Sequence, residues 1–217
     1  MSFPLSPQLL RGAIVSFKLP DPVPHVILFQ YNPPSLTRTL EARTAGGGEA
    51  AGEEAFRIAG APNETIKVEI ELDAADSLTE ASGGPSAQGV LPQLAAIEIL
   101  LHPSSVLVVA NAILAQLGTI EILPPQAPFT LFIYGRNRIL PVRITDYSAT
   151  EDAHDPDLAP IRAKVSLGMK VLTYSDLPAS HVGHHLYLAH QIAKEAMALG
   201  ATVQSLDAVL GSGVRIL

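Results

Sequence analysis

The sequence contains no cysteine and no tryptophan. Without cysteine the protein cannot form disulfide bonds, thiolate metal sites such as zinc fingers, or a cysteine nucleophile. Aromatic residues of the other kinds are also few, with 5 tyrosines and 6 phenylalanines. This scarcity argues against a surface that stacks sugars or nucleic-acid bases on aromatic rings.

Basic residues are fewer than acidic ones. The chain has 14 Lys and Arg against 21 Asp and Glu, which gives a formal charge of −7. Nucleic acids and anionic membranes are bound through basic surfaces, so we expect neither nucleic-acid binding nor direct membrane insertion. The first residues, MSFPLSPQLLRG, lack a charged region followed by an apolar one, and no apolar run reaches about 18 residues. We therefore expect a cytoplasmic protein without a signal peptide or membrane span.

Aliphatic residues are abundant instead. Hydrophobic residues make up 47% of the 217 positions, enough for a substantial core. The clearest pattern lies at residues 161–172 (IRAKVSLGMKVL), where apolar and polar side chains alternate as in a strand with one buried face. At about 3.3 Å per residue, this strand would span roughly 40 Å and cross most of a domain.

Residues 65–72 (TIKVEIEL) have the same alternation, with mainly acidic side chains on the polar face. If both strands belong to one antiparallel sheet, Arg162 and Lys164 can lie near Glu69 and Glu71. Exposed cross-strand pairs contribute only about 0.2–1 kcal/mol each, so they would set the register of the strands more than the stability of the fold.

Shorter alternating segments predict more strands. These are residues 11–18, 25–31, 36–43, 119–123, 129–134 and 139–148. In the last of them, Ile144 is expected to face the core, while Thr145 and Tyr147 face the opposite side. The acidic residues 150–157 (TEDAHDPD) are expected to form the loop to the long strand.

Three segments favour helices. Residues 89–101 carry apolar side chains at helical spacing, with Pro92 in the first turn, where proline is tolerated. Residues 106–117 are interpreted as a second helix packed against the sheet, although so short an apolar run is also compatible with a strand. Residues 181–199 show a longer apolar stripe and end at Gly200. We expect this helix to dock on a partner or on its own domain.

These elements predict an α+β fold that is mainly antiparallel β: a β-sandwich or barrel with an inserted helix and a C-terminal helical appendage. The domain organisation that follows is a β domain at residues 1–175 and a helical docking extension at 176–217. This architecture by itself does not indicate an activity.

A histidine cluster is the one group that has the residue types of a metal site. It comprises His181, His184, His185 and His190. His181 and His185 are four residues apart, which places two imidazoles on one helical face, but the intervening Glu of zinc proteases and a third ligand are missing. We interpret these residues as solvated or interface histidines and predict no metal.

Catalytic motifs are missing as well. The glycines at 46–48 are not followed by the Lys of a phosphate loop, no Gly-x-Ser-x-Gly motif occurs, and the acidic 150–157 segment lacks the Gly and distal Glu of a calcium loop. We therefore predict no catalytic residue, no cofactor and no enzymatic activity.

The order of several short segments resembles the tube-like proteins of contractile injection systems, the phage-tail-like particles built around an inner tube. The matching segments are FQYNP with a following Ser at 29–35, PNETIKVEIELD at 62–73, GVLPQL at 89–94, PP at 124–125 leading into 129–135, and PIRAKV at 160–165. Together they cover about residues 11–175.

This resemblance implies a tail-tube-like β-sandwich that assembles into a homo-hexameric ring where inner tube, spike or hub protein and baseplate meet. Family members often carry a C-terminal LysM module, but residues 174–217 lack its Gly-Asp-Thr-Leu core, so peptidoglycan binding is not expected. Tyr134 also stands where a Trp is common. The particle would assemble in the cytoplasm and could be released from the cell.

The polar face of the two long strands is the candidate interface with neighbouring subunits or with the tube lumen. Its residues are Lys67, Glu69, Glu71, Arg162, Lys164 and Lys170. Two alternatives remain open: a stand-alone β-sandwich module that binds a ligand or a metal, and a metal-dependent hydrolase that uses the histidine cluster.

Overall fold

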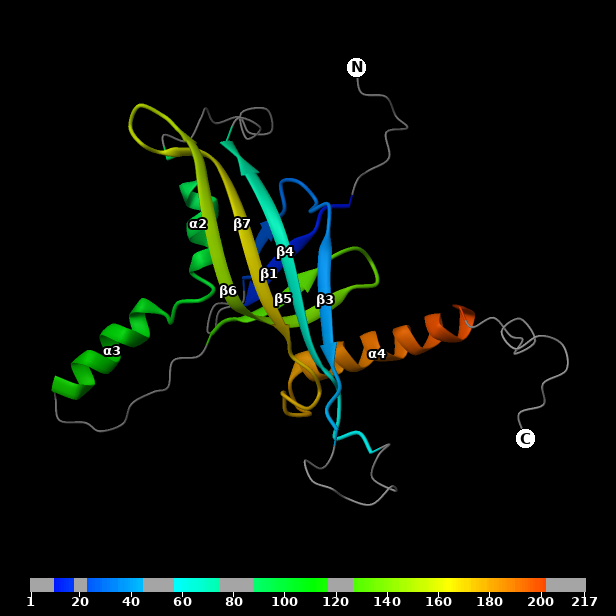
Figure 1. Ribbon diagram of the computed structural model, residues 1–217. Coiled ribbons are helices and arrows are strands. Elements are labelled where there is room, and N and C mark those ends of the chain that lie inside the picture. Colours follow the sequence, from blue (N-terminus) through cyan, green and yellow to red (C-terminus); the bar gives the residue numbers. More distant parts are fainter. Residues whose placement is uncertain (1–9, 18–22, 45–56, 75–87, 117–126, 202–217) are drawn as a thin grey trace, which may run out of the picture.

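The computed structural model describes residues 10–17, 23–44, 57–74, 88–116 and 127–201, which form a seven-stranded antiparallel sheet and three helices (Figure 1). The strands are β1 (Ala13–Phe17), β2 (His25–Leu28), β3 (Leu36–Glu41), β4 (Asn63–Asp73), β5 (Phe129–Ile133), β6 (Ile139–His154) and β7 (Pro160–Val171), and the helices are α2 (Leu91–Glu98), α3 (Ser105–Gln116) and α4 (Val182–Ala201). The predicted α+β class is confirmed.

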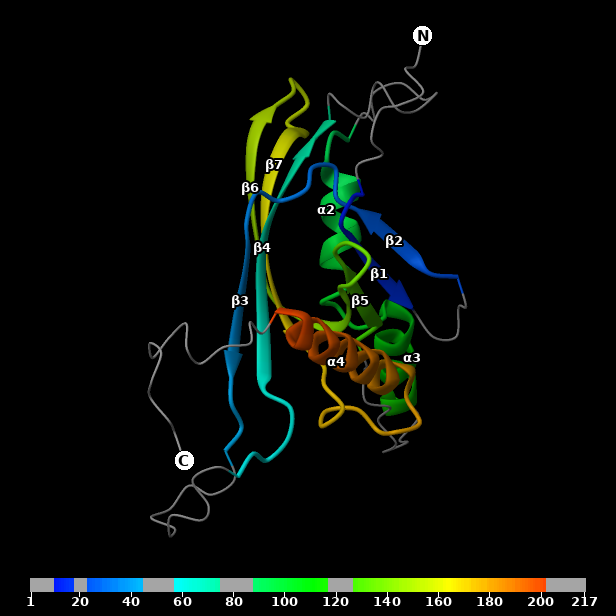
Figure 2. The ribbon, with the colours of Figure 1, turned by 90° about the vertical axis from the view of Figure 1, so that its right-hand side faces the viewer.

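The sheet runs in the order β2-β1-β5-β6-β7-β4-β3 and bends so that it forms two layers (Figure 2). The long strands β6, β7, β4 and β3 form one layer, and β1, β2 and β5 lie opposite them on the same side as α2 and α4. Strand β6 joins the layers, since it pairs with both β5 and β7. The sheet is not closed into a barrel, because β2 and β3 are its two terminal strands.

The core lies between these layers. Every second residue of β4 and β7 is buried, as the alternation predicted: Ile66, Val68, Ile70 and Leu72 on β4, and Ala163, Val165, Leu167, Met169 and Val171 on β7. Leu94 and Ile97 of α2 close the core from the other side, and Phe29 and Phe132 fill its centre. Burying a large aliphatic side chain contributes about 1.5–3 kcal/mol, so this cluster is the main source of stability.

The start of α2 is held against the start of β7. The Val90 N–H donates to Pro160 O at 2.9 Å. Gly89 has φ +56°, and a Cβ at this position would lie 2.1 Å from the same carbonyl oxygen. Only glycine fits this contact, because a side chain is excluded both by the backbone conformation and by the neighbouring carbonyl.

Strand β6 differs from the prediction in two ways. It continues through His154, so most of the acidic segment expected to be a loop, residues 150–157, belongs to the strand. A register shift also lies between Ile144 and Asp146, which makes Thr145 a bulge residue. A bulge inserts one residue and reverses the faces beyond it, so Tyr147 packs against the core instead of facing away from it.

Helix α3 forms where residues 106–117 were predicted to be helical, but its predicted packing against the sheet is wrong. None of its residues is buried, and Val106 is 74% exposed. The apolar composition of this helix was interpreted as burial within the chain, whereas the helix extends away from the sheet (Figure 1). The predicted strand at 119–123 lies outside the described residues.

Candidate assembly surfaces

The predicted charged face is present on β4 and β7. The two strands are antiparallel neighbours, with Glu71 opposite Lys164 and Asp73 opposite Arg162. Lys164 Nζ lies 3.5 Å from Glu71 Oε1, as expected from the sequence. Arg162 instead pairs with Asp73, at 2.8 Å, and Glu69 faces Ser166. The prediction that opposite charges meet across these strands is confirmed.

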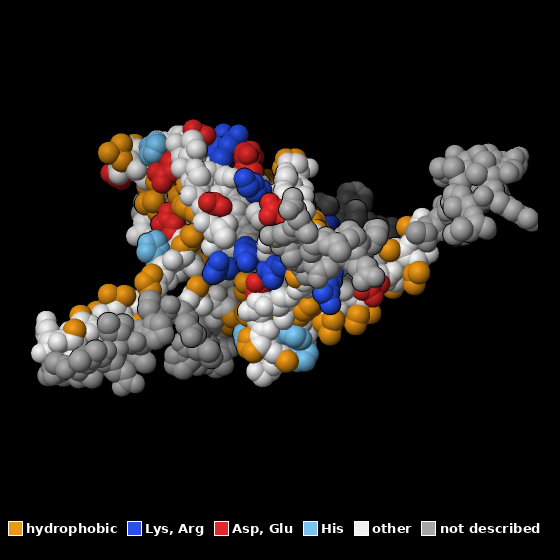
Figure 3. All heavy atoms as spheres, turned by 60° about the horizontal axis from the view of Figure 1, so that its bottom comes forward, with side chains coloured by type: hydrophobic (Ala, Val, Ile, Leu, Met, Phe, Trp, Pro, Cys, Tyr) orange, Lys and Arg blue, Asp and Glu red, His pale blue; other side chains and the backbone are white. Residues whose placement is uncertain are grey.

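The six predicted residues share one face of the sheet, and all are exposed except Lys170, which is half-buried. The side chains of Lys164 and Glu71 are 48% and 56% exposed, so their ion pair contributes little to folding. The face is uncovered by the described elements, because α2, α4 and the short strands all lie on the other side (Figure 2). Figure 3 shows acidic and basic side chains mingled across the middle of the molecule.

Both terminal strands present an open edge. Within the described residues, β2 pairs only with β1 and β3 pairs only with β4. On β2, Val26 and Leu28 are 53% and 58% exposed, and Leu40 is exposed on β3. Charged residues, proline and bulges usually protect an edge from association, whereas exposed aliphatic side chains favour pairing with another chain.

A buried carboxylate attaches α4 to the sheet. Glu64 of β4 is 0% exposed; Arg38 Nε of β3 donates to its Oε1 at 2.7 Å, and Lys194 Nζ of α4 lies 3.5 Å from Oε2. The sequence interpretation missed this contact. Glu64 has the same parity as the buried Ile66 and Val68, so the alternation could have identified it as an inward-facing carboxylate that needs a cation.

The segment between β7 and α4 contains a second carboxylate with several partners. Although burial opposes its ionisation, Asp176 accepts hydrogen bonds from the N–H and hydroxyl groups of Thr173 and from Arg43, and Lys170 Nζ lies 3.6 Å away. These contacts lower the pKa of Asp176 to about 2. The C-terminal helix is thus held at Glu64, and the segment that leads into it is held at Asp176.

The outer side of α4 is apolar. Its buried residues are Gly183 and Tyr187, and the side facing the domain also carries His190 and Lys194. Leu188, Ile192 and Leu199, by contrast, are exposed on the outer side. Figure 3 shows hydrophobic side chains along both arms of the molecule, α3 and α4. None of the described helices has the length and apolar character that a membrane crossing requires.

The histidines contact protein groups. His181 Nδ1 accepts the Gly183 N–H at 3.0 Å and its ring packs edge-on against Phe129, while His184 Nδ1 donates to Leu177 O at 3.3 Å. His190 Nδ1 donates to Asn137 O, and burial followed by the charge of Lys194 lowers its pKa. Among the described residues no group of three or more His, Asp or Glu is placed to hold a metal ion.

A large apolar cavity lies between α2, α3, the short strands and the start of α4. Its volume is about 1050 Å³, and its lining includes Ile27, Ile99, Leu107, Leu177 and His181. The volume is at the upper end of the range for small-molecule sites, and polar side chains from Ser16, His25, His102, Ser104, Arg143, Ser180 and His181 also line it.

No family model matches the chain, and no curated protein matches it. Among solved structures, the chain is similar to a chain in the 6-fold symmetrised baseplate of the anti-feeding prophage, with 15% identity and a TM-score of 0.29. The match covers 79% of this chain and 93% of that chain. A superposition with so low a score does not establish a role.

Proposed function

We propose that the chain is a structural, non-enzymatic subunit of a contractile injection particle, which forms a homo-hexameric ring at the junction of inner tube, spike and baseplate. The ordered segments between residues 11 and 175 that resemble tube-like proteins suggest this class of particle. The observation that carries the proposal is the open sheet, whose two terminal strands both have an unpaired outer edge within the described residues.

An open sheet can be extended by copies of itself. If the outer edge of β2 in one copy pairs with the outer edge of β3 in the next, the contact is head-to-tail, and such contacts close into rings when the rotation between copies allows it. The charged face of β4 and β7 would then lie on one surface of the ring and line a wet lumen. In this arrangement Lys67, Glu69, Glu71, Arg162, Lys164 and Lys170 face solvent or the neighbouring subunit.

The β2 edge can be tested by one substitution. The Phe29 N–H donates to Gly12 O at 2.8 Å, so the odd-numbered residues of this strand bond to β1 and the Val26 N–H points outward. Val26→Pro removes this outward donor and leaves the β1 ladder intact. We expect it to abolish six-fold rings in negative-stain images of the protein with its tube partner.

Val26→Thr is the matched control, since it keeps the β-branched shape and the N–H donor, and should still form rings. Wild-type protein that stays monomeric at micromolar concentration beside the tube protein would contradict the proposed function. Equal ring formation by Val26→Pro and wild type would show that the β2 edge is not the contact.

A second candidate is a stand-alone module that binds a ligand, and the apolar cavity of about 1050 Å³ favours it. Such a module would act as a single copy. The monomeric outcome of the ring experiment would therefore support this candidate.

A further inference from the structure

A basic pocket lies between β3, α4 and the 134–138 turn that joins β5 to β6. Its volume is about 460 Å³, and Arg38, Arg136, Arg138 and Lys194 line it, with no carboxylate among the described lining residues. Four of the chain's 14 Lys and Arg residues thus meet in one place on a molecule with a formal charge of −7. The pocket is suited to a ligand that brings negative charge.

Within the described residues, two of these cations have no carboxylate partner. Arg38 and Lys194 are held by Glu64 beneath the pocket, whereas neither Arg136 nor Arg138 forms an ion pair within the described residues. The guanidinium of Arg138 lies 5.8 Å from the centre of the Tyr134 ring, which limits its freedom. The turn is closed by the Tyr134 N–H donating to Arg138 O at 2.9 Å.

The same turn is fixed to α4 by the hydrogen bond between His190 Nδ1 and Asn137 O, at 3.2 Å. Both arginines therefore extend from a braced turn rather than from a free loop. Preorganised cations lose less conformational freedom when an anion binds.

The end of the β6–β7 hairpin carries an excess of acidic side chains, although His154 and Arg162 lie beside them. The tip of the β6–β7 hairpin carries Glu151, Asp152, Asp155 and Asp157, and Leu158 protrudes with 78% of its surface exposed. Asp155 Oδ1 accepts the N–H groups of Asp157 and Ala159 at 2.9 and 2.8 Å, which fixes the turn. The Asp157 carboxylate remains exposed.

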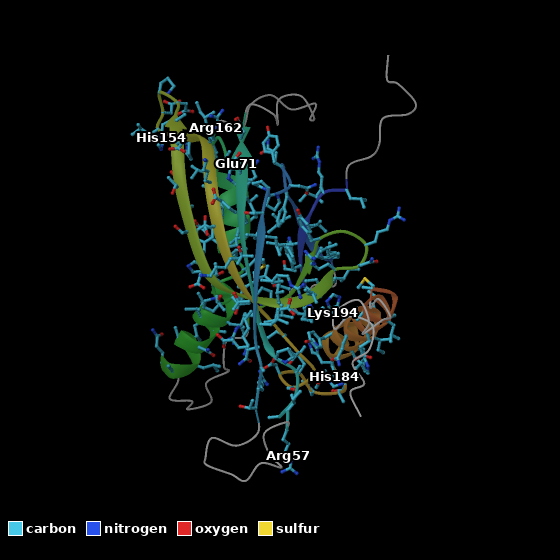
Figure 4. All side chains as sticks on the ribbon, turned by 45° about the vertical axis from the view of Figure 1, so that its right-hand side comes forward. Arg57, Glu71, His154, Arg162, His184 and Lys194 are labelled. Carbon is cyan, nitrogen blue, oxygen red and sulfur yellow. The ribbon has the colours of Figure 1, made fainter. Side chains whose placement is uncertain are left out.

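The acidic tip and the basic pocket lie at opposite ends of the molecule. In Figure 4, His154 and Arg162 mark the hairpin end, and Lys194 marks the pocket on the other side of the sheet. The tip lies at the opposite end of the long β6 and β7 strands from the 134–138 turn and α4 (Figure 1). The two surfaces therefore cannot meet within one copy, but they can meet between two.

We propose that the basic pocket of one copy binds the acidic β6–β7 tip of a second copy. Each copy offers one tip and one pocket, so the contact is head-to-tail and can repeat. Charge complementarity favours this pairing, because a basic pocket attracts an acidic tip. The inference rests on the proposed function, in which copies of the chain assemble, and it adds a contact distinct from the sheet edges.

Charge reversal tests the contact by sedimentation velocity of the full chain without the tube protein. Arg136→Glu in the pocket and Asp157→Lys in the tip should each weaken self-association by roughly tenfold or more, since an attraction becomes a repulsion. The double variant Arg136→Glu/Asp157→Lys should recover most of the lost association. Raising the salt from about 50 to about 500 mM should weaken the wild-type contact.

Arg143→Glu and Glu98→Lys are the matched controls, because each makes the same change in net charge outside the tip, the pocket and the two sheet edges. Thermal melting checks that all variants fold, and Arg136→Gln replaces Arg136→Glu if the reversal prevents folding. Unchanged association in both reversals, or an equal loss in the controls, overturns the proposal. It is also overturned if Arg136→Glu loses binding of inorganic phosphate while association stays the same.

These outcomes distinguish failure of the tip–pocket contact from failure of the proposed ring. Rings that form normally with the tube protein while Arg136→Glu self-associates like wild type overturn the tip–pocket contact and leave the proposed function standing. If the wild type forms no ring, but each single reversal weakens self-association and the double variant recovers it, the tip–pocket contact is supported and the proposed function is not.

Discussion

At the scale of single residues, Gly168 shows how the bulge in β6 constrains β7. Its backbone is ordinary extended strand, so the position does not need glycine for its conformation. The Asp146 side chain, placed by the bulge, lies where a Cβ would be: the Cβ would come within 2.7 Å of Asp146 Oδ2 and 3.0 Å of Asp146 Cβ. The glycine is therefore required by its neighbour.

We expect Gly168→Ala to lower the free energy of unfolding by about 1–2 kcal/mol, because the added methyl overpacks against Asp146. Alanine for glycine in an unhindered strand would act in the opposite direction, by reducing the entropy of the unfolded chain. Urea denaturation measures the difference. Ser166→Ala, on the same face of β7, is the control and should stay within about 0.5 kcal/mol of wild type.

At the scale of elements, period-two alternation was sufficient to predict β4 and β7, since each strand keeps one register over its whole length. The same reasoning placed Tyr147 on the wrong face, because a single extra residue at Thr145 reverses every side chain after it. The sequence around Thr145 does not indicate this bulge. The Asp146 side chain is accommodated only because Gly168, on the neighbouring strand β7, has no side chain. The Lys164–Glu71 pair could be predicted from the sequence, because both residues lie in strand segments without a bulge.

Two ion pairs with the same N–O distance are expected to contribute differently to stability, and one of them attaches α4. Lys194–Glu64 and Lys164–Glu71 are both separated by 3.5 Å, but only Glu64 is buried. Lys194→Met keeps the apolar stem and leaves Glu64 with Arg38 alone, so we expect a loss of about 1–2 kcal/mol. Lys164→Met should cost less than about 0.5 kcal/mol.

Hydrogen exchange distinguishes loss of helix docking from loss of the whole fold. Lys194→Met should accelerate exchange of the α4 amides while those of β7 stay protected, because local opening costs less than global unfolding. If both lysine substitutions lower the free energy of unfolding equally and hydrogen exchange in α4 does not change, then Arg38 alone satisfies Glu64 and Lys194 does not hold the helix.

At the scale of the whole molecule, sequence patterns predict which side chains are buried but not what buries them. The exposed apolar residues of α3 and of the outer side of α4 have the periodicity of core helices, and in this chain nothing among the described residues covers them. The composition of α3 was interpreted correctly as helical and incorrectly as packed on the sheet. In the proposed assembly a neighbouring chain would cover these side chains, and a single sequence does not specify such a contact.

Helices α2 and α3 let this interpretation be tested within one chain. Ile97 of α2 is 1% exposed and Ile113 of α3 is 52% exposed. Ile97→Ser should destabilise the isolated chain by about 3 kcal/mol or more, through the cavity and the buried hydroxyl. Ile113→Ser should leave the melting temperature of the isolated chain unchanged, because serine and isoleucine have similar helix propensities. It should nevertheless reduce ring formation with the tube protein, since the apolar contact of Ile113 forms only on assembly. If Ile113→Ser melts like wild type and assembles equally well, α3 is not part of the assembly surface; if it unfolds the isolated chain, α3 is packed within the chain after all.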